Sequence, residues 1–249
     1  LRGMELSVVI PTYNERERLG ELIHTITSIF RSAGIRGEVI VVDDNSPDGT
    51  GEVANQLAQQ DDDVKVVHRP GKLGLGSAVM KGFSTAQGDV LGVMDADFGH
   101  PPALLPHMLE AIRKDADFVV ASRYIPGGGT RGWSTSRLIM SHLGCHLARP
   151  LTPVRDATSG FFLVKRDIVY NTQISVVGFK ICLELLVRGH AHAVVELPYL
   201  FTNRLIGESK MNTRETFRYL GQLGSLFLHR LRNRRHGRYP SYRQLPPPA

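Results

Sequence analysis

The chain has 249 residues, enough for one or two domains, and its 42% hydrophobic content is ample for a packed core. No apolar run approaches the roughly 18–20 residues that span a bilayer, no signal-peptide pattern is present, and two cysteines indicate neither a disulfide framework nor a zinc site. The charge is uneven, because residues 214–249 hold eight arginines against one acidic residue, while the whole chain carries a net charge of only +6.

Short apolar runs that are typical of buried strands alternate with segments whose apolar residues recur at helical spacing. In chain order the predicted elements are strand 6–10, helix 19–30, strand 39–42, helix 53–57, strand 64–67, helix 77–86, strand 90–94, helix 104–112, strand 118–121, helix 137–149, strand 161–164, helix 179–187, strand 194–197 and a final helix that Thr213 caps. Asn14, with Glu17 three residues later, resembles the start of the first helix. The alternation predicts an α/β fold with a doubly wound, mostly parallel sheet and helices on both faces.

The predicted strand 90–94 leads directly into Asp95 and Asp97. Residues two apart on a strand point to the same side, and open α/β sheets bind ligands beyond the carboxyl ends of their strands. Two carboxylates at such a place can hold a hard divalent ion such as Mg²⁺ or Mn²⁺. The simpler alternative is a solvated turn.

Two further strand ends carry polar or aromatic residues. The segment from Pro11 through Tyr13 to Glu15 follows the first strand, and Asp43 and Asp44 follow the second. An aromatic ring can stack on a base, and a carboxylate can accept hydrogen bonds from a base or ribose. The combination suits a nucleoside diphosphate, although the chain has neither a dinucleotide-binding glycine turn nor a phosphate-binding loop ending in Lys-Ser/Thr.

Eight segments together carry a resemblance to a known family. They are SVVIPTYNE (7–15), VVDDNSPDGT (41–50), KLGLGSA (72–78), MDAD (94–97), SRY (122–124), TSGF (158–161), GFK (178–180) and GESK (207–210). They resemble family 2 glycosyltransferases of the GT-A fold, and within that family the polyprenyl-phosphate (dolichol-phosphate) mannose synthases. The resemblance covers about residues 5–230 and is more specific for the polyprenyl-phosphate branch than for the sugar.

The resemblance implies roles for individual residues. The nucleoside would be bound by Pro11, Tyr13, Glu15, Val42 and Asp44. The ribose and diphosphate would be contacted by Asp95, Ala96 and Asp97, with Asp97 ligating Mg²⁺ or Mn²⁺. Phosphates of the donor or acceptor would be bound by Arg123, Arg204 and Lys210, with Arg137 as a weaker candidate. Asp156 would lie near the sugar or the acceptor, and the catalytic residues would be Asp95, Asp97 and Arg123.

Simpler interpretations stay open for several of these positions. Arg123 could close a strand end and pair with a surface acid, and the other three basic residues could be solvated. The position two beyond Asp97 is often Gln or Ser in this family, whereas Gly99 occupies it here. The metal would then keep an extra water, or His100 would replace the missing ligand, although His100 is also explained as a structural residue at a helix start.

The implied reaction is transfer of a hexose, expected to be mannose from GDP-mannose, to a polyprenyl or dolichyl phosphate with inversion at the anomeric carbon. A phosphate monoester is largely dianionic near neutral pH, so no strong general base is required. The alternatives are a polyprenyl-phosphate glucosyltransferase using UDP-glucose, a family 2 transferase acting on a soluble glycan, and a non-catalytic nucleotide-sugar-binding protein.

The expected organisation is a GT-A catalytic domain over 1–212, an amphipathic basic helix over 213–236 and a disordered tail over 237–249. The basic helix predicts a peripheral, cytoplasmic protein held at an anionic membrane surface, with a membrane-embedded partner as the alternative anchor. The tail could instead be a plain soluble end. Nucleic acid is not expected as a partner, because residues 1–213 are not basic.

Overall fold

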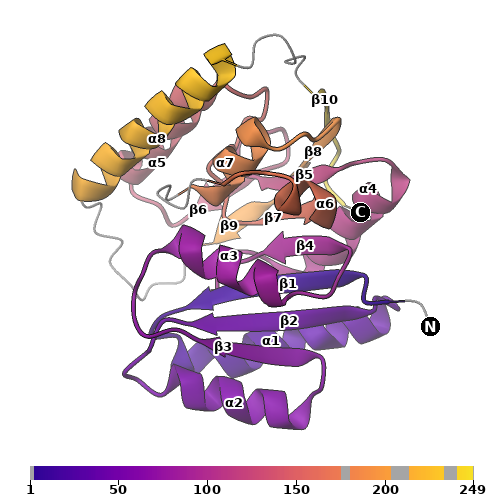
Figure 1. Ribbon diagram of the computed structural model, residues 1–249. Helices are drawn as coiled ribbons and strands as arrows, with labels where there is room; N and C mark the ends of the chain where they lie inside the picture. Colours follow the sequence, from indigo (N-terminus) through magenta and orange to yellow (C-terminus); the bar gives the residue numbers. More distant parts are fainter. Residues whose placement is uncertain (1–2, 175–179, 203–212, 233–239, 249) are drawn as a thin grey trace.

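Eight strands form one central sheet in the computed structural model, which describes residues 3–174, 180–202, 213–232 and 240–248 (Figure 1). The strands of this sheet are β1 (Leu6–Thr12), β2 (Gly37–Asp43), β3 (Val64–His68), β4 (Val90–Val93), β5 (Phe118–Ser122), β7 (Phe162–Lys165), β8 (Ala193–Pro198) and β10 (Ser241–Gln244). Strands β6 (Gly129–Arg131) and β9 (Leu200–Thr202) pair in a second, two-stranded sheet. The helices are α1 (Arg16–Ser32), α2 (Thr50–Gln60), α3 (Leu75–Thr85), the 3₁₀ helix η1 (Pro102–Leu104), α4 (Leu105–Lys114), α5 (Thr135–Ala148), α6 (Arg166–Tyr170), α7 (Ile181–Arg188) and α8 (Thr213–Arg232). The predicted α/β fold is confirmed.

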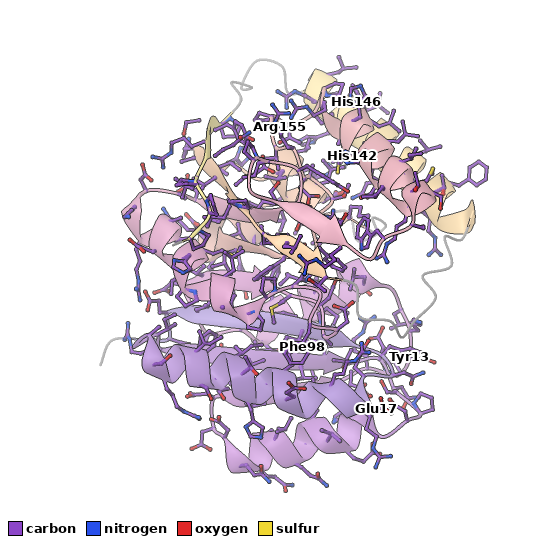
Figure 2. The ribbon with its side chains drawn as sticks, turned by 180° about the vertical axis from the view of Figure 1, so that it is seen from behind. Tyr13, Glu17, Phe98, His142, His146 and Arg155 are labelled. Atoms are coloured by element: carbon purple, nitrogen blue, oxygen red, sulfur yellow. The ribbon has the colours of Figure 1, made fainter. Side chains whose placement is uncertain are left out.

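Alternate residues of the strands pack into two separate hydrophobic layers, one on each face of the sheet. Val8 and Ile10 of β1 pack with α1, α2 and α4 on one face, whereas Val9 packs with α3, α6 and α7 on the other. Because both faces are covered, the central strands β1 and β2 are almost entirely buried and read as continuous apolar runs. Figures 1 and 2 show these two helical layers from opposite sides.

The strand order is β10-β8-β5-β7-β4-β1-β2-β3, and β7 alone runs antiparallel to its neighbours within the described residues. From β1 the chain continues outward to β2 and β3, and then returns to place β4 on the other side of β1. This reversal is a topological switch point, where a crevice opens beyond the carboxyl ends of the strands. The segments after β1, β2 and β4 therefore meet at one edge of the sheet.

The start of α1 is capped by a neighbouring loop, so the predicted Asn14 cap is wrong. Asn14 adopts a left-handed backbone conformation (φ 61°), and the N-cap position falls on Glu15 without a capping bond of its own. The N–H groups of Glu15 and Arg16 are instead accepted by Thr50 Oγ1 (2.9 Å) and Asp48 Oδ2 (3.2 Å). These bonds tie the loop after β1 to the loop after β2.

The expected disorder over 237–249 is also wrong for part of that range. Residues Ser241–Gln244 form β10, which pairs in parallel with β8 and completes the edge of the sheet. The unpaired backbone groups of an edge strand offer such a pairing to any extended segment, and the prolines of this tail lie outside the paired residues.

Helix α8 lies beside α5, as Figures 1 and 2 show from both sides. Tyr219 Oη donates a hydrogen bond to the Gly144 carbonyl (2.6 Å), and Leu223 and Leu226 of α8 are buried in the same core layer as α7. Within the described ranges, no helix combines the length and the hydropathy that crossing a membrane requires.

Candidate active site

The switch point gathers the acidic residues predicted from the sequence. Asp95 and Asp97 follow β4, and Glu15 follows the neighbouring strand β1. Burial and the charges of Asp97 and Asp95 raise the pKa of Glu15 to about 7, while Arg18 opposes the shift. Burial also raises the pKa of Asp95. Three carboxyl groups thus lie within electrostatic reach of one another, an arrangement that attracts a cation.

A sharp turn after β4 sets the direction of Asp97. Phe98 adopts a left-handed conformation (φ 58°), which is unusual for a residue with a side chain, and the turn lets the Gly99 N–H donate to Asp97 Oδ1 (2.9 Å). A Cβ atom at Gly99 would lie 2.5 Å from the Phe201 ring and 2.9 Å from Asp97 Oδ1. Phe201 therefore occupies the space in which a side chain at position 99 would begin, so the Phe201 ring would have to move to admit one.

His100 acts as a structural support for Asp95. Its side chain is 3% exposed and stacks on Phe161, and its Nδ1 accepts the Asp95 backbone N–H (3.1 Å). Burial lowers the pKa of His100 to about 4, although Asp97 opposes the shift, so the ring is neutral with its proton on Nε2. With one nitrogen accepting and the other protonated, His100 does not replace the metal ligand that glycine removes from position 99.

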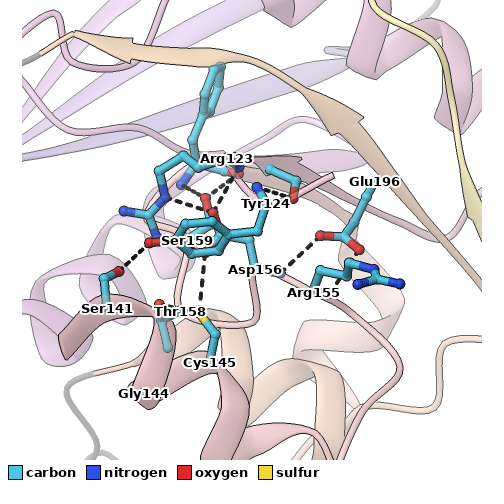
Figure 3. A network of polar contacts seen from close by, with 12 residues as sticks. Arg123, Tyr124, Ser141, Gly144, Cys145, Arg155, Asp156, Thr158, Ser159 and Glu196 are labelled. Carbon is cyan, nitrogen blue, oxygen red and sulfur yellow. Dashed lines mark hydrogen bonds and ion pairs between the residues drawn. The ribbon is translucent and has the colours of Figure 1, made fainter. Parts of the chain in front are cut away.

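Arg123 and Asp156 form a buried ion pair, which Figure 3 shows in detail. Arg123 donates from Nε and Nη2 to the two Asp156 carboxylate oxygens, both at 2.7 Å, and from its backbone N–H at 3.0 Å. Although burial disfavours its charged form, the Asp156 carboxylate holds the pKa of Arg123 above its ordinary value. Arg123 does pair with an acid, as the simpler interpretation expected, but that acid is fully buried and not on the surface.

The loop that carries Asp156 is fixed from the sheet side. The Glu196 carboxylate of β8 accepts the backbone N–H groups of Arg155 (2.8 Å) and Asp156 (3.0 Å), and it also accepts a short hydrogen bond from Tyr242 of β10. The C-terminal strand thus supports the position of the Arg123 guanidinium through two intervening carboxylates.

Arg137 lies on the first turn of α5, where Ser134 caps the helix by accepting its N–H. Its guanidinium stacks over the Trp133 ring at 4.1 Å. Burial and the nearby Arg123 lower the pKa of Arg137, while Asp97 opposes the shift. Arg137 is therefore directed into the site and is not simply solvated. This position makes it a stronger candidate for binding phosphate than the sequence indicated.

The residues that the resemblance assigns to the nucleoside lie on neighbouring strand ends. Pro11 and Val42 are register partners in β1 and β2. Asp44 is buried against Arg69, with Oδ1 3.1 Å from Arg69 Nη1. Tyr13, which Figure 2 labels, is 37% exposed, and the Lys72 ammonium lies 4.0 Å from the centre of its ring. An aromatic ring and a carboxylate thus follow directly after the neighbouring strands β1 and β2.

A cavity of about 530 Å³ joins the acidic residues to the helices α5 and α8. Its polar lining includes Asp95, Asp97, Arg123, Arg137 and Lys180. The residues assigned to the nucleoside lie outside this lining, as do the buried Ala96 and Asp156. Arg204 and Lys210 fall outside the described residues.

Two residues without an assigned role also line the cavity, Trp133 and Lys180. The signal for Lys180 was present in the sequence, because it ends the Gly-Phe-Lys segment that contributes to the resemblance. Trp133 is the single tryptophan of the chain, and nothing in its sequence neighbours distinguishes it from an ordinary packing residue.

The carboxylates fit a divalent cation whose remaining ligands come from water and from the substrate. In the part of the chain that the structure describes, no three His, Cys, Asp or Glu side chains come together as a closed metal site. Mg²⁺ is commonly held by one or two carboxylates together with waters and substrate phosphates. Asp97, within reach of Asp95 and the high-pKa Glu15, provides that kind of open site.

Replacing Glu15 with glutamine should make the fold less sensitive to pH. The folded-state pKa of about 7 lies above the ordinary value of 4.5, so ionising Glu15 costs wild-type stability as pH rises from about 4.5 to 7. Glutamine does not ionise. In a chelator, Glu15→Gln should melt close to wild type near pH 4 and at a higher temperature at pH 8. A difference in melting temperature that does not change with pH would contradict the shift.

Comparisons with known proteins show the family of the chain. The family model described as Glycosyl transferase family 2 matches residues 7–172. A dolichol-phosphate mannosyltransferase from Pyrococcus furiosus is 42% identical over 221 residues, which cover 87% of this chain and 62% of that relative. The chain thus spans less than two thirds of that protein. A dolichol-phosphate mannosyltransferase from Saccharomyces cerevisiae is 37% identical over 236 residues, which cover 91% of this chain and 88% of the relative.

Solved structures share the fold. Mannosyl-3-phosphoglycerate synthase from Rubrobacter xylanophilus matches with a TM-score of 0.68 at 22% identity, covering 94% of this chain and 76% of that one. Glucosyl-3-phosphoglycerate synthase from Mycobacterium tuberculosis, crystallised with Mn²⁺, UDP-glucose and phosphoglyceric acid, matches with a TM-score of 0.64 at 20% identity, covering 89% and 80%.

Proposed function

This chain belongs to glycosyl transferase family 2, and we propose that it transfers mannose from GDP-mannose to the phosphate of a polyprenol or dolichol. The observation that carries the proposal is one continuous cavity, whose lining combines carboxylates and cations with apolar side chains from helices α5 and α8. The relatives named above, which align over most of this chain, support the choice of sugar and acceptor.

The apolar part of the lining suits an isoprenoid. The side chains from α5 and α8 that form it are Met140, Leu143, Leu147, Tyr219 and Leu220. An acceptor chain lying there would bury apolar surface, at about 25 cal/mol per Å². Its phosphate would then point toward Arg123 and Arg137, the two arginines of the lining.

The chemical step needs no strong base. An oxygen of the acceptor phosphate would attack the anomeric carbon, the bond from that carbon to the donor diphosphate would break, and the configuration would invert. Asp97 would hold Mg²⁺ or Mn²⁺, which supplies positive charge to the leaving diphosphate. Asp95 and Ala96 would contact the ribose and diphosphate, and Pro11, Tyr13, Glu15, Val42 and Asp44 would bind the nucleoside.

The main obstacle is repulsion between two anionic substrates, which cations offset. The charge of Arg123 is already matched by Asp156, so its contribution is a directed hydrogen-bond donor more than a net positive charge. Arg137, stacked on Trp133, is the better placed source of net charge among the described arginines of the lining. Arg204 and Lys210 are proposed to add to it.

We also propose that the chain sits peripherally on the cytoplasmic face of a membrane. The outer faces of α5 and α8 expose large apolar side chains, among them Phe217 (73% exposed), Ile139 (60%) and Leu228 (55%). Three exposed leucines of these helices, Leu143, Leu147 and Leu220, also line the cavity. The eight arginines over 214–249 would favour anionic lipid. A membrane-embedded partner is the alternative anchor.

A double substitution, Ile139→Ser with Phe217→Ser, should weaken binding to anionic vesicles by at least about tenfold. Each buried side chain of this size contributes about 1.5–3 kcal/mol to membrane partitioning, and 1.4 kcal/mol is tenfold in affinity. Vesicle sedimentation at low and high salt measures the effect. Leu73→Ser is the matched control, since Leu73 is 64% exposed and belongs to the loop before α3, not to α5 or α8. Equal binding by the double variant and the control would favour the partner protein as the anchor.

The proposed activity is tested by incubating the chain with nucleotide sugars, Mg²⁺ or Mn²⁺ and a short polyprenyl phosphate, followed by mass spectrometry of the lipid product. We expect mannosyl phosphoryl polyprenol from GDP-mannose. A glucosyl product from UDP-glucose would establish the alternative donor. Tight nucleotide-sugar binding without any product would favour a non-catalytic binding protein.

A further inference from the structure

Lys180 is a cation of the cavity without an assigned role. It precedes α7 and lines the cavity together with Asp95 and Arg123. Burial and Arg123 lower its pKa, and Asp95 opposes that shift. Among the charges that act on Asp95, Lys180 has the largest effect, ahead of Arg123. Its side chain therefore lines the same cavity as Asp95 and Asp97, the cavity in which an anionic substrate would bind.

The main chain at Lys180 is held by a side chain from α8. Lys180 precedes the first turn of α7 and is not helical (φ −107°, ψ 83°), and one side chain bonds both its N–H and its C=O. Gln222 Oε1 accepts the Lys180 N–H (3.3 Å), and Gln222 Nε2 donates to the Lys180 carbonyl (3.1 Å). The Gln222 side chain is buried, so both bonds are shielded from water.

Further polar contacts fix the register of α8 along α7. Gln222 Nε2 also donates to Glu184 (2.9 Å), and Glu184 accepts from Arg188 (2.6 Å). Arg188 in turn donates to Ser225 of α8 (3.0 Å). Around this polar strip the contact between the helices is apolar, through Leu223 and Leu226. A polar strip in an apolar contact favours one alignment of the two helices.

We propose that Gln222 is a positioning residue, which holds the Lys180 ammonium where it contacts a phosphoryl oxygen of a bound substrate. The inference rests on the proposed function and adds a cation to that site. It also links the position of α8 on α7 to the position of Lys180 in the cavity. The outer face of α8 is apolar. A shift of α8 would move the Lys180 backbone, because the N–H and the C=O of Lys180 are both bonded to the Gln222 side chain of that helix.

The test is a double-mutant cycle on the full chain, with Lys180→Met, Gln222→Leu and the combination. Lys180→Met should lower kcat/KM by about 10- to 100-fold, and Gln222→Leu by about tenfold, because a small displacement of a positioned group has effects of this size. In the Lys180→Met background, Gln222→Leu should have no further effect. Ser225→Ala is the matched control, because it removes one hydrogen bond between α7 and α8 but leaves both Gln222–Lys180 bonds and the apolar contact in place, and it should stay within about twofold of wild type.

Two binding measurements identify the phosphate and separate this inference from the proposed function. Calorimetry with GDP and Mg²⁺ reports on the donor diphosphate, and KM for a short polyprenyl phosphate reports on the acceptor. Weaker GDP binding by Lys180→Met assigns the contact to the donor, and a raised acceptor KM alone assigns it to the acceptor. If wild type binds GDP but transfers no sugar, the proposed function fails, and the GDP affinities alone decide about Lys180.

The inference is overturned if Lys180→Met changes neither the affinity for GDP nor the KM for the polyprenyl phosphate. It is also overturned if Gln222→Leu acts equally in both backgrounds, or if Ser225→Ala matches it. Circular dichroism and melting temperatures identify variants that fail to fold. Should Lys180→Met be one of them, Lys180→Gln takes its place in the cycle, because glutamine removes the charge and keeps a polar group in the cavity.

Discussion

Asp97→Asn is expected to lower turnover by about 100- to 1,000-fold at saturating substrate. Asp97 is the carboxylate proposed to hold the cation, and removing one contact of this kind costs about 2.7–4 kcal/mol of transition-state stabilisation. The fold should be unaffected, because an asparagine oxygen can still accept the Gly99 N–H that Asp97 Oδ1 now accepts. Initial rates over a range of Mg²⁺ and Mn²⁺ concentrations measure the effect.

Asp62→Asn is the control for the loss of one negative charge, because Asp62 is exposed and lies on the loop before β3. Its rate should equal that of wild type. If Asp97→Asn retained full turnover at every metal concentration, Asp97 would not be the metal ligand. Partial recovery of the Asp97→Asn rate at high metal concentration would instead support the assignment, since weaker binding can be overcome by mass action.

Asp156→Ala is expected to give the largest loss of stability, about 3–5 kcal/mol of unfolding free energy. The carboxylate is fully buried and accepts three hydrogen bonds from Arg123, so its removal leaves a buried guanidinium without a counter-ion. For a chain of this length the melting temperature should fall by about 6–20 °C, at roughly 2–4 °C per kcal/mol. Differential scanning calorimetry provides the measurement.

Two comparisons isolate the cause. Glu110→Ala breaks an exposed ion pair with Lys114 and should leave the melting temperature nearly unchanged. The double variant Arg123→Met with Asp156→Ala should be more stable than Asp156→Ala alone, because it removes the uncompensated charge. If Asp156→Ala had the same melting temperature as Glu110→Ala, the Arg123–Asp156 ion pair would not stabilise the fold. The interpretation that Asp156 orients Arg123 would then be wrong.

Position 99 shows how a departure from a family pattern can originate in the fold. A residue with a side chain is frequent there in the family, and from the sequence Gly99 looks like the loss of a ligand. In the structure the Phe201 ring fills the space where that side chain would begin. Phe201 lies on β9, about a hundred residues along the chain, so no local sequence pattern could connect the two positions.

The sequence by itself determined strands β1 to β5, β7 and β8, most of the helices and the acidic residues after β4, because each depends on local order, whereas the short strands β6 and β9 were not predicted. Apolar runs of strand length and acids two residues apart are visible along the chain, and parallel strands bring their carboxyl ends to one edge. The same reasoning failed at Asn14 and over the C-terminal tail. There the partners, Asp48 and Thr50 for the helix start and β8 for the tail, belong to other elements.

Tertiary structure alone decided which charges face one another. Arg123 meets Asp156 across 33 residues, and Gln222 meets Lys180 across 42. Composition and spacing give no information about such pairs, because a charge or an amide forms the same bonds with any partner that packing brings near. Periodicity therefore specified where polar groups emerge from the core, and the packing of α5, α7 and α8 on the sheet specified what those groups contact.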